Sequence, residues 1–413
     1  MKAAILTIGD ELLIGQVVDT NSSWIAQQLN LAGIKVERKI SVGDDAEVIR
    51  EELERLLRFV DFIFITGGLG PTKDDITKNT LVDFFEDHLV MHEESLQNVK
   101  RIFKNAGREP NAANIQQAMQ PLKAKIFVNL NGTASGMCFE KENKVVVSMP
   151  GVPFEMKSML LNQVIPLLAE RFQKVHIIHK TICTQGIGES FVAEKIEDIE
   201  SSLPDHIKLA YLPSVGQLKL RLSAYGVAAE QEVNEYVNKI VERISENVFG
   251  FGEATLQEVI GALLKQQNKT LSTAESCTGG YVSHLITSVP GSSAYYKGGV
   301  IAYSNEIKIQ ELGVNQQVLA EFGAVSKQVV EQMANGILKV TGSDFAIATS
   351  GIAGPDGGSD EKPVGTVWIA VAGKGGMFSK DFKFGDNRER NIIRASLTAL
   401  SILRRKFLIT DKE

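Results

Sequence analysis

The sequence predicts an α/β protein in three parts, and three observations support this prediction. With 413 residues, the chain is long enough for two or three domains. Short apolar runs alternate with amphipathic helical patterns before residue 172 and again after residue 252, as in sheets covered by helices on both faces. Between them the pattern is strand, helix, two strands, helix, which is typical of a small α+β unit. We therefore expect domains at 1–171, 172–252 and 253–413.

In the first part, the alternation of strand and helix predicts a parallel sheet with helices on both faces. A glycine-rich run, FGFG at 249–252, marks the boundary of the third part, where a new α/β unit begins. We expect strands at 5–8, 35–42, 62–65, 145–148, 177–184, 217–225, 270–273, 300–303, 345–349 and 366–372, and helices beginning near Asn21–Ser22, Asp44, 75, 93, 154, Thr255, Ser276 and Arg388.

Composition excludes several classes of protein. The formal net charge of -6, without a long basic run, argues against direct binding of nucleic acid. No apolar run reaches the ~18 residues of a membrane-spanning helix, and the N-terminus lacks the features of a signal peptide. The three cysteines are far apart, which suits a reducing compartment. We expect a cytoplasmic protein whose partners are small molecules.

The strongest chemical signal is the run AESCTGG at 274–280, which follows a strand and precedes a helical pattern. A nucleophile there would lie beside backbone N–H groups that stabilise an oxyanion. Ser276 alone is also typical of a helix N-cap, and Cys277 is either a nucleophile or a small core residue. Two further runs, YSNEIK at 303–308 and SGIAGPDGG at 350–358, follow other strands. Such strand ends are where open α/β sheets bind ligands.

A serine nucleophile needs a base, and His284 is the only histidine nearby. A lysine can serve if burial lowers its pKa. Taken alone, Lys308 is typical of a solvated helix and Tyr303 of a half-buried strand.

Together the three runs resemble the CinA C-terminal domain, the family of nicotinamide mononucleotide deamidases, over about 255–408. The resemblance implies amide hydrolysis without a cofactor, with Ser276 as nucleophile, Lys308 as general base and Tyr303 beside them. Arg388 matches the family's Gly-Asp-Arg element with one inserted residue, Asn387, and Arg394 is a weaker candidate for the phosphate contact. Glu275 is expected either to orient Lys308 or to bind ribose hydroxyls. The expected substrate contacts are Glu275, Thr278, Gly279, Gly280, Asn305, Ser350, Gly351, Gly354 and Arg388.

The N-terminal part carries a second group of polar residues. The run TGGLGPTKDD at 66–75 places a glycine loop before a helical pattern, and such a loop offers N–H groups to phosphate. Asp74 and Asp75 are expected in the first turn of that helix, where they either hold a divalent metal or complement the helix dipole. We expect substrate contacts at Asn21, Gly67, Gly68, Gly70 and Thr72, and metal ligands at Asp10, Glu11 and Asp75.

Residues 1–170 resemble the MoaB/MogA-like molybdopterin-binding domain found at the N-terminus of CinA proteins. The resemblance implies a three-layer α/β/α fold and an ADP-ribose pyrophosphatase that depends on a divalent metal (Mg, Mn or Co), possibly together with K. Asp74 stands where the relatives commonly have arginine, which suits a metal better than an anionic pterin. A pterin- or nucleotide-binding module without catalysis is the alternative.

The middle part resembles the KH-type domain of CinA proteins. Its run GIGE at 186–189 lacks the basic residues of a nucleic-acid clamp, so we expect a spacer or dimerisation unit. The resemblance also implies a homodimer. A regulatory partner in DNA uptake or damage response remains a further alternative for the whole protein.

Overall fold

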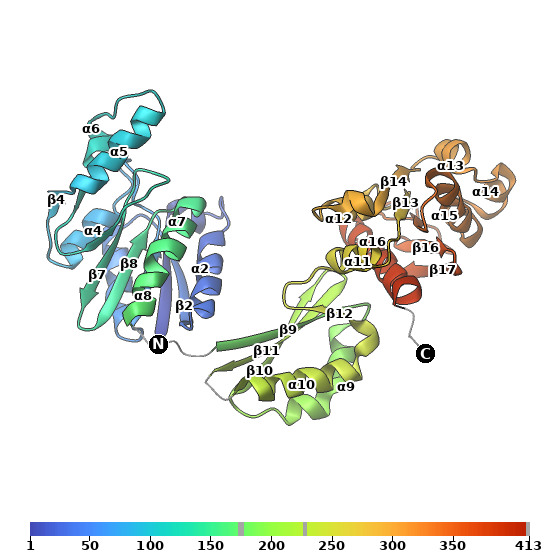
Figure 1. The fold of residues 1–413 in the computed structure, drawn as a ribbon, viewed down its shortest axis with the longest axis horizontal. Coiled ribbons are helices and arrows are strands. Elements are labelled where there is room, and N and C mark those ends of the chain that lie inside the picture. The colour runs from blue at the N-terminus through green and yellow to red at the C-terminus, as the bar shows by residue number, and fades with distance from the viewer. Residues whose placement is uncertain (172–176, 226–228, 410–413) are drawn as a thin grey trace. The chain divides into compact units, whose positions relative to one another are not determined.

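The computed structural model describes residues 1–171, 177–225 and 229–409. The chain divides into two compact units, the first from Met1–Ile177 and the second from most of the residues that follow (Figure 1). The expected boundary between 171 and 172 lies at the edge of residues 172–176, outside the described residues.

The first unit is built on a six-stranded sheet. Its four strands β2, β1, β3 and β8 are parallel, and β7 and β6 extend the sheet antiparallel. The central strands are almost fully buried, as expected for strands covered on both faces. In spatial order the strands are β2 (Lys35–Val42), β1 (Lys2–Ile8), β3 (Phe62–Thr66), β8 (Lys144–Met149), β7 (Gly136–Lys141) and β6 (Lys125–Phe127).

Helices cover both faces of this sheet, and alternate strand residues feed two separate cores. Ile5 packs with α2, α7 and α8 on one face, whereas Leu6 packs with α3 and α4 on the other. A separate two-stranded antiparallel sheet is formed by β4 (Leu89–Met91) and β5 (Met119–Pro121). The helices are α1 (Asp10–Leu13), α2 (Thr20–Leu31), α3 (Ala46–Leu57), α4 (Thr77–Phe84), α5 (Glu93–Asn105), α6 (Ala112–Gln116), α7 (Pro153–Met159) and α8 (Ile165–Arg171).

Three helix starts differ from the prediction. Asp19 caps α2 by accepting from Ser22 N, in place of Asn21 or Ser22. Asp45, one residue beyond the expected Asp44, caps α3. Helix α4 begins only at Thr77, so Asp74 and Asp75 lie in the preceding loop and not in its first turn. For α2 and α3, several cap-type residues stand side by side, and propensity alone does not choose between them. For α4, the N-cap position is Ile76, and no side chain caps the helix.

The second unit begins with an antiparallel sheet packed on two helices, as predicted for the α+β part. Helices α9 and α10 bury the apolar face of this sheet in one core. In spatial order the strands are β10 (Ile207–Ser214), β11 (Gln217–Tyr225), β9 (Ile177–Gln185) and β12 (Val248–Phe251), and the helices are α9 (Glu189–Ser201) and α10 (Ala229–Arg243).

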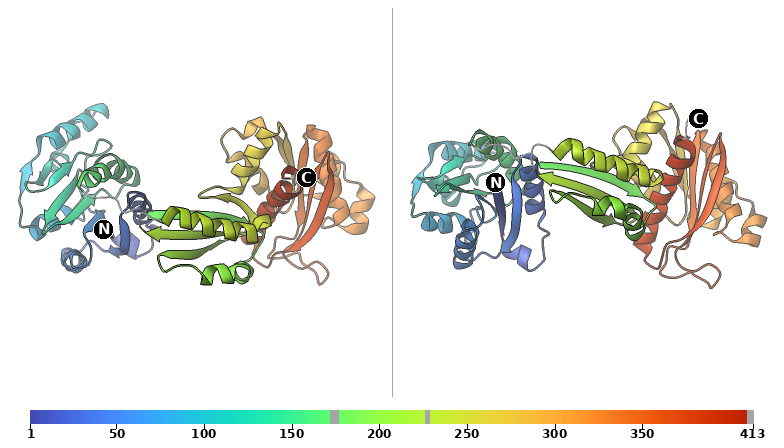
Figure 2. Two further views of the ribbon diagram at one scale, coloured as in Figure 1. Left: turned by 60° about the horizontal axis from the view of Figure 1, so that its bottom comes forward. Right: turned by 90° about the horizontal axis from the view of Figure 1, so that it is seen from below.

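The rest of the second unit is a mixed five-stranded sheet between two helical layers. Strands β14, β13 and β15 are parallel, and β16 and β17 continue antiparallel. Helices α11, α12 and α16 share one core and α13 and α15 the other; Figure 2 shows α16, in red, against the orange strands. The strands are β14 (Tyr296–Ile301), β13 (Leu271–Glu275), β15 (Phe345–Gly351), β16 (Thr366–Gly373) and β17 (Gly376–Lys383), and the helices are α11 (Leu256–Gln266), α12 (Tyr281–Thr287), α13 (Asn305–Leu312), α14 (Gln316–Phe322), α15 (Lys327–Thr341) and α16 (Arg388–Leu403).

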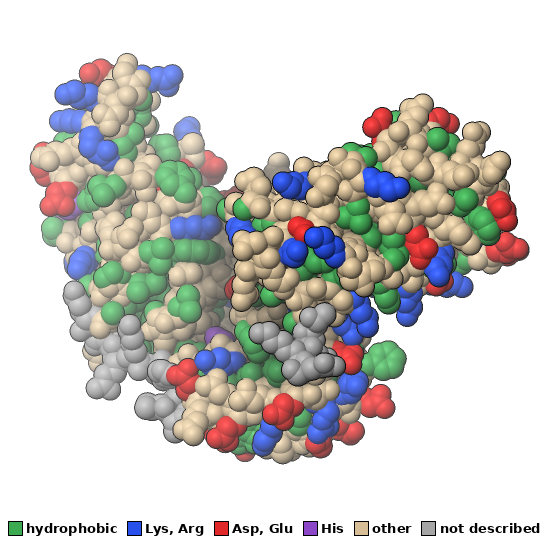
Figure 3. All heavy atoms as spheres, turned by 45° about the vertical axis from the view of Figure 1, so that its right-hand side comes forward, with side chains coloured by type: hydrophobic (Ala, Val, Ile, Leu, Met, Phe, Trp, Pro, Cys, Tyr) green, Lys and Arg blue, Asp and Glu red, His purple; other side chains and the backbone are tan. Residues whose placement is uncertain are grey.

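The distribution of surface charge and the lengths of the helices can be compared with what the composition predicts. On the face drawn in Figure 3, basic and acidic side chains are interspersed, and neither sign forms a continuous stripe. Within residues 1–171, 177–225 and 229–409, no helix has the length and apolar character needed to cross a bilayer.

Candidate active site

The C-terminal sheet brings the three predicted runs together. Strands β14, β13 and β15 are parallel neighbours, so the loops that follow them meet at one edge. Ser276 follows β13, and Lys308 lies on α13, after β14. Ser350 is near the end of β15. Ser276 and Ser350 are 74 positions apart in the sequence, and the sheet topology brings them into one site.

Ser276 and Lys308 form a buried pair. Lys308 Nζ lies 3.1 Å from Ser276 Oγ and donates to Ala302 O at 2.7 Å. Lys308 is 1% exposed, and burial lowers the pKa of its ammonium group. Among the residues that the structure describes, no salt bridge holds Lys308. The pair therefore has the geometry of a hydroxyl nucleophile with an amine base.

Cys277 is next to the nucleophile but has a different environment. Its side chain is buried in the core of α11, α12 and α16. Burial raises the pKa of the thiol to about 12, so it stays protonated and unreactive at neutral pH. Of the two alternatives for Cys277, the structure supports the core residue.

Tyr303 and Arg388 lie at the mouth of the site. Arg388 Nη2 donates to the Tyr303 hydroxyl at 2.9 Å, and Nη1 donates to Gly354 O at 2.6 Å. Tyr303 is 60% exposed and lines the cavity. The extra residue Asn387 caps α16 and leaves Arg388 in the site. Arg394 donates instead to Phe384 O and does not line the cavity.

These side chains surround a cavity of about 230 Å³. Four of the expected substrate contacts line this cavity: Asn305, Ser350, Gly351 and Arg388. Gly354 does not line it, and its carbonyl accepts a hydrogen bond from Arg388. Sequence reasoning missed Ala324, Val325 and Ala353, because the small residues of a loop carry no chemical signal. The lining residues are Ser276, Cys277, Tyr303, Asn305, Lys308, Ala324, Val325, Ser350, Gly351, Ala353 and Arg388.

The expected roles of Glu275 and Thr278 do not agree with the structure. Both side chains are buried beneath the turn 276–280. The Glu275 carboxylate accepts five hydrogen bonds from the protein, one of them from Thr278 Oγ1 at 2.7 Å. It neither contacts Lys308 nor faces the cavity, since the strand places its side chain on the opposite side of the turn.

The predicted helix start at Ser276 is also wrong, because α12 begins at Tyr281. Residues 276–280 form a tight turn in which Gly279 and Gly280 have positive φ angles of 60° and 95°. Ser276 N donates to Thr349 O at 2.9 Å, so Ser276 is anchored to β15 and is not a helix N-cap. The glycines shape the turn and do not line the cavity.

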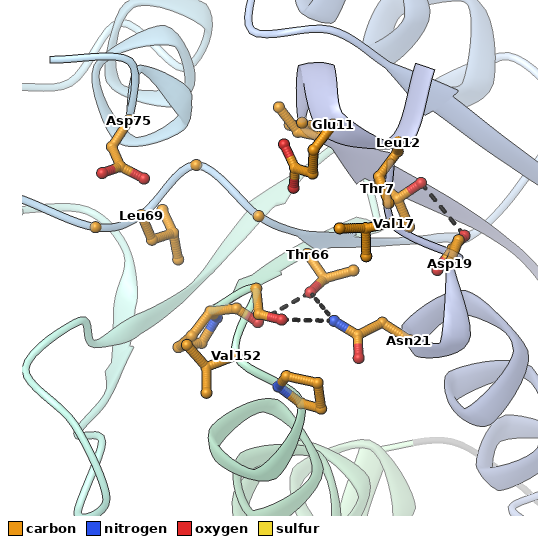
Figure 4. Close-up of a pocket in the computed structure, with 18 of the residues that line it drawn as sticks. Thr7, Glu11, Leu12, Val17, Asp19, Asn21, Thr66, Leu69, Asp75 and Val152 are labelled. Atoms are coloured by element: carbon orange, nitrogen blue, oxygen red, sulfur yellow. Dashed lines mark hydrogen bonds between the residues drawn. The ribbon is translucent and has the colours of Figure 1, made fainter. Parts of the chain in front are cut away.

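The first unit has a larger cavity, of about 390 Å³, at the carboxyl ends of β1, β3 and β8. Gly67, Gly68 and Gly70 line it as predicted, and Asn21 closes one wall by donating to Gly151 O at 2.7 Å (Figure 4). Thr72 does not line it. A side chain at Gly67 would collide with Ile8 O, so the loop must pass close to β1.

The three expected metal ligands do not converge. Asp10 faces the loop after β2, where it accepts from Asp44 N at 3.2 Å. Asp75 accepts from Thr72 N at 2.9 Å, and Glu11 folds back over Gly9. Within the described parts of the chain, no group of three His, Cys, Asp or Glu side chains is arranged to hold a metal. The expected trio therefore does not fit a preassembled metal site.

The cavity is nonetheless strongly acidic. Burial, together with repulsion from Asp10, Glu11 and Asp74, raises the pKa of the Asp44 carboxyl. No Lys or Arg stands among its described lining residues. Asp44 was not predicted as a site residue, because it appeared to be a helix cap. The carboxylates that line the cavity are Glu11, Asp19, Asp44, Asp74, Asp75 and Glu155.

Comparisons with known proteins follow this division of the chain. Family profiles match three segments: "Probable molybdopterin binding domain" at residues 4–170, "Damage-inducible protein CinA KH domain" at 179–250 and "CinA C-terminal domain" at 253–407. A competence/damage inducible protein CihA from Agrobacterium tumefaciens, of known structure, is 41% identical over 36% of this chain and 91% of its own, with a TM-score of 0.35.

Two relatives match almost the whole chain. A CinA-like protein from Flavobacterium psychrophilum is 48% identical over 99% of both chains. Another from Cytophaga hutchinsonii is 46% identical over 98% of this chain and 97% of its own. Since the similarity spans all three parts, the chain belongs to the CinA family.

Proposed function

We propose that the C-terminal site hydrolyses the carboxamide of nicotinamide mononucleotide. The observation that carries this proposal is the contact of 3.1 Å between Lys308 Nζ and Ser276 Oγ in a buried setting. A lysine whose pKa is lowered by burial can take the serine proton. Arg388 at the mouth supplies a cation suited to the phosphate of the nucleotide.

The reaction follows from this pair. Neutral Lys308 takes the proton of Ser276 as Oγ bonds to the amide carbon, and then gives it to the departing nitrogen, which leaves as ammonia. Water attacks the resulting acyl ester with Lys308 again as base, and the C–Oγ bond breaks. Nicotinate mononucleotide leaves and Ser276 regains its proton.

Ammonia release from nicotinamide mononucleotide tests the proposal. We expect Ser276→Ala to lower kcat by at least about 10³-fold, because in the described residues Ser276 Oγ is the only hydroxyl or thiol group hydrogen-bonded to Lys308 Nζ. Cys277→Ala should stay within several-fold of wild type, since its thiol is buried and protonated. An inactive wild type, or an active and correctly folded Ser276→Ala, would contradict the proposal.

As a second function, we propose metal-dependent cleavage of ADP-ribose to AMP and ribose 5-phosphate in the N-terminal cavity. The supporting observation is a glycine loop beside six carboxylates, with no basic side chain in the described lining. A diphosphate carries negative charge and cannot enter such a field without a cation to compensate it.

The test is AMP formation with Mg²⁺, Mn²⁺ or Co²⁺, with and without K⁺ and with EDTA as control. We expect AMP formation to depend on the metal. The rate should fall at least tenfold in Asp44→Asn, because this variant removes a negatively charged group that attracts the metal cation. Calorimetric binding of ADP-ribose without AMP formation would instead support the binding module.

A further inference from the structure

Glu275 is a buried carboxylate without a basic partner. The side chain is 1% exposed, and no salt bridge in the described residues involves it. Its charge is balanced by hydrogen bonds alone. Oε2 accepts from Thr278 Oγ1 at 2.7 Å, Gly280 N at 3.0 Å and Val282 N at 3.0 Å. Oε1 accepts from Ser283 N at 2.8 Å and Ser283 Oγ at 2.6 Å.

These donors come from the two segments that follow the nucleophile. Thr278 and Gly280 belong to the turn 276–280, and Val282 and Ser283 to the first turn of α12. The carboxylate itself extends from the last residue of β13. It therefore ties strand, turn and helix into one rigid piece, and it uses the N–H groups of α12 that would otherwise attract a substrate anion.

We propose that Glu275 is a positioning residue that holds the turn in the shape in which Ser276 Oγ meets Lys308. This inference rests on the proposed serine chemistry but gives Glu275 no contact with substrate. A second tie supports it, since Thr278 Oγ1 also lies 2.7 Å from Thr349 Oγ1, on the strand that anchors Ser276 N.

An amide cannot replace this carboxylate. Both oxygens of Glu275 face backbone N–H groups, so the NH₂ of a glutamine would oppose either Ser283 N or the pair Gly280 N and Val282 N. Two donors facing each other repel, and one buried N–H group loses its acceptor. Glu275→Gln, although isosteric, should therefore displace the turn.

The matched control is Glu258→Gln. Glu258 also caps a helix in this domain, because its carboxylate accepts from Thr255 N at 2.9 Å at the start of α11. We expect Glu275→Gln to lower kcat for ammonia release about 10²-fold with KM within threefold, because small misplacement of a nucleophile is costly. The pH midpoint of the activity should not move. Glu258→Gln should keep wild-type kcat.

Labelling of Ser276 with a fluorophosphonate measures the reactivity of the serine without using nicotinamide mononucleotide. Ser276 Oγ forms the P–O bond, fluoride leaves, and the serine proton passes to Lys308. We expect Glu275→Gln to be labelled at Ser276 at least tenfold more slowly than wild type. If wild type is labelled but releases no ammonia, the proposed function fails and the positioning role is still measured.

Thr278→Val covers the case in which Glu275→Gln does not fold. It removes one hydrogen-bond donor to Glu275 and should lower both kcat and the rate of labelling severalfold. The melting temperature should stay within a few degrees of the wild-type value. Wild-type kcat and labelling in folded Glu275→Gln would overturn the proposal. Equal losses of kcat and labelling rate in Glu258→Gln would also overturn it. A tenfold rise in KM without a change in kcat would overturn it as well, because it would indicate that Glu275 contacts the substrate.

Discussion

At the scale of single residues, the candidate site depends on a lysine kept out of water. Lys308 lies at the second turn of α13, yet its Nζ is directed inward to Ser276 Oγ and to two carbonyls, those of Ala302 and Tyr303. Burial disfavours the charged form and lowers the pKa, while interactions with Cys277 and with the charge of Glu306 act against this. The balance of the two effects sets the fraction of neutral base.

This balance predicts the pH dependence of ammonia release. Only the neutral amine accepts a proton, so kcat/KM should rise with pH through one ionisation below the ordinary lysine value of 10.5. Glu306→Gln removes a charge that raises the pKa of Lys308, so the midpoint should move to lower pH. Glu311→Gln, on the same helix, is the control. The shift should shrink in high salt, because Glu306 is exposed; a midpoint unchanged at low salt would exclude this coupling.

The sequence marked the reactive side chains of the site, but it did not show which neighbouring side chains face the cavity and which are buried. Ser276, Lys308 and Arg388, which their runs mark in the sequence, line one cavity. Glu275, Thr278 and Cys277 belong to the same run, but all three are buried away from the cavity or in a core. Adjacent residues of a strand and turn face opposite sides, and a motif written as letters does not say which side is inward.

At the scale of elements, strand positions could be predicted and loop geometry could not. Strand 35–42 agrees with β2 because its residues alternate between apolar and polar, and strand 62–65 agrees with β3 because it is a continuous apolar run. The strand expected at 300–303 lies instead at Tyr296–Ile301, and β17 was not predicted. Helix α12 starts five residues late, because Glu275 and two left-handed glycines make a turn that no propensity scale describes.

The turn supplies a prediction that compares its two glycines. Both have positive φ, but a side chain at Gly279 would meet nothing within 4 Å, whereas one at Gly280 would lie 2.9 Å from Ile301 Cδ1. Gly279→Ala should lower the free energy of unfolding by about 1 kcal/mol, the cost of a left-handed alanine, with little change in kcat. Gly280→Ala should cost more and lower kcat at least tenfold.

Ile301→Val provides the rescue, because it removes the Cδ1 atom that the new methyl group would meet. The double variant should regain most of the kcat lost in Gly280→Ala, while keeping the backbone cost. Urea unfolding and ammonia release measure both effects. Equal behaviour of the two glycine variants would show that φ alone, and not the contact with Ile301, governs this turn.

At the scale of the whole molecule, the predicted middle and C-terminal parts are not independent. Cys183 and Phe249, both of the middle part, are buried in the core formed by α11, α12 and α16. Arg404 is also buried and donates to Val248 O, and Arg405 pairs with Glu246 at 2.8 Å. The sequence showed the boundary at 249–252 as a change of pattern, but side chains packed across a boundary leave no periodic signal.

This shared core predicts how the chain responds to shortening. Residues 177–413 should retain the kcat and KM of the full chain for nicotinamide mononucleotide, because every residue around Ser276 and Lys308 belongs to the second unit. Residues 253–413 should melt about 10 °C lower, since losing a buried aromatic side chain such as Phe249 costs about 3 kcal/mol. Phe249→Ala within 177–413 should reproduce most of that loss with kcat unchanged at 25 °C. Equal melting temperatures for the two fragments would mean that the middle part only covers this core and does not stabilise it.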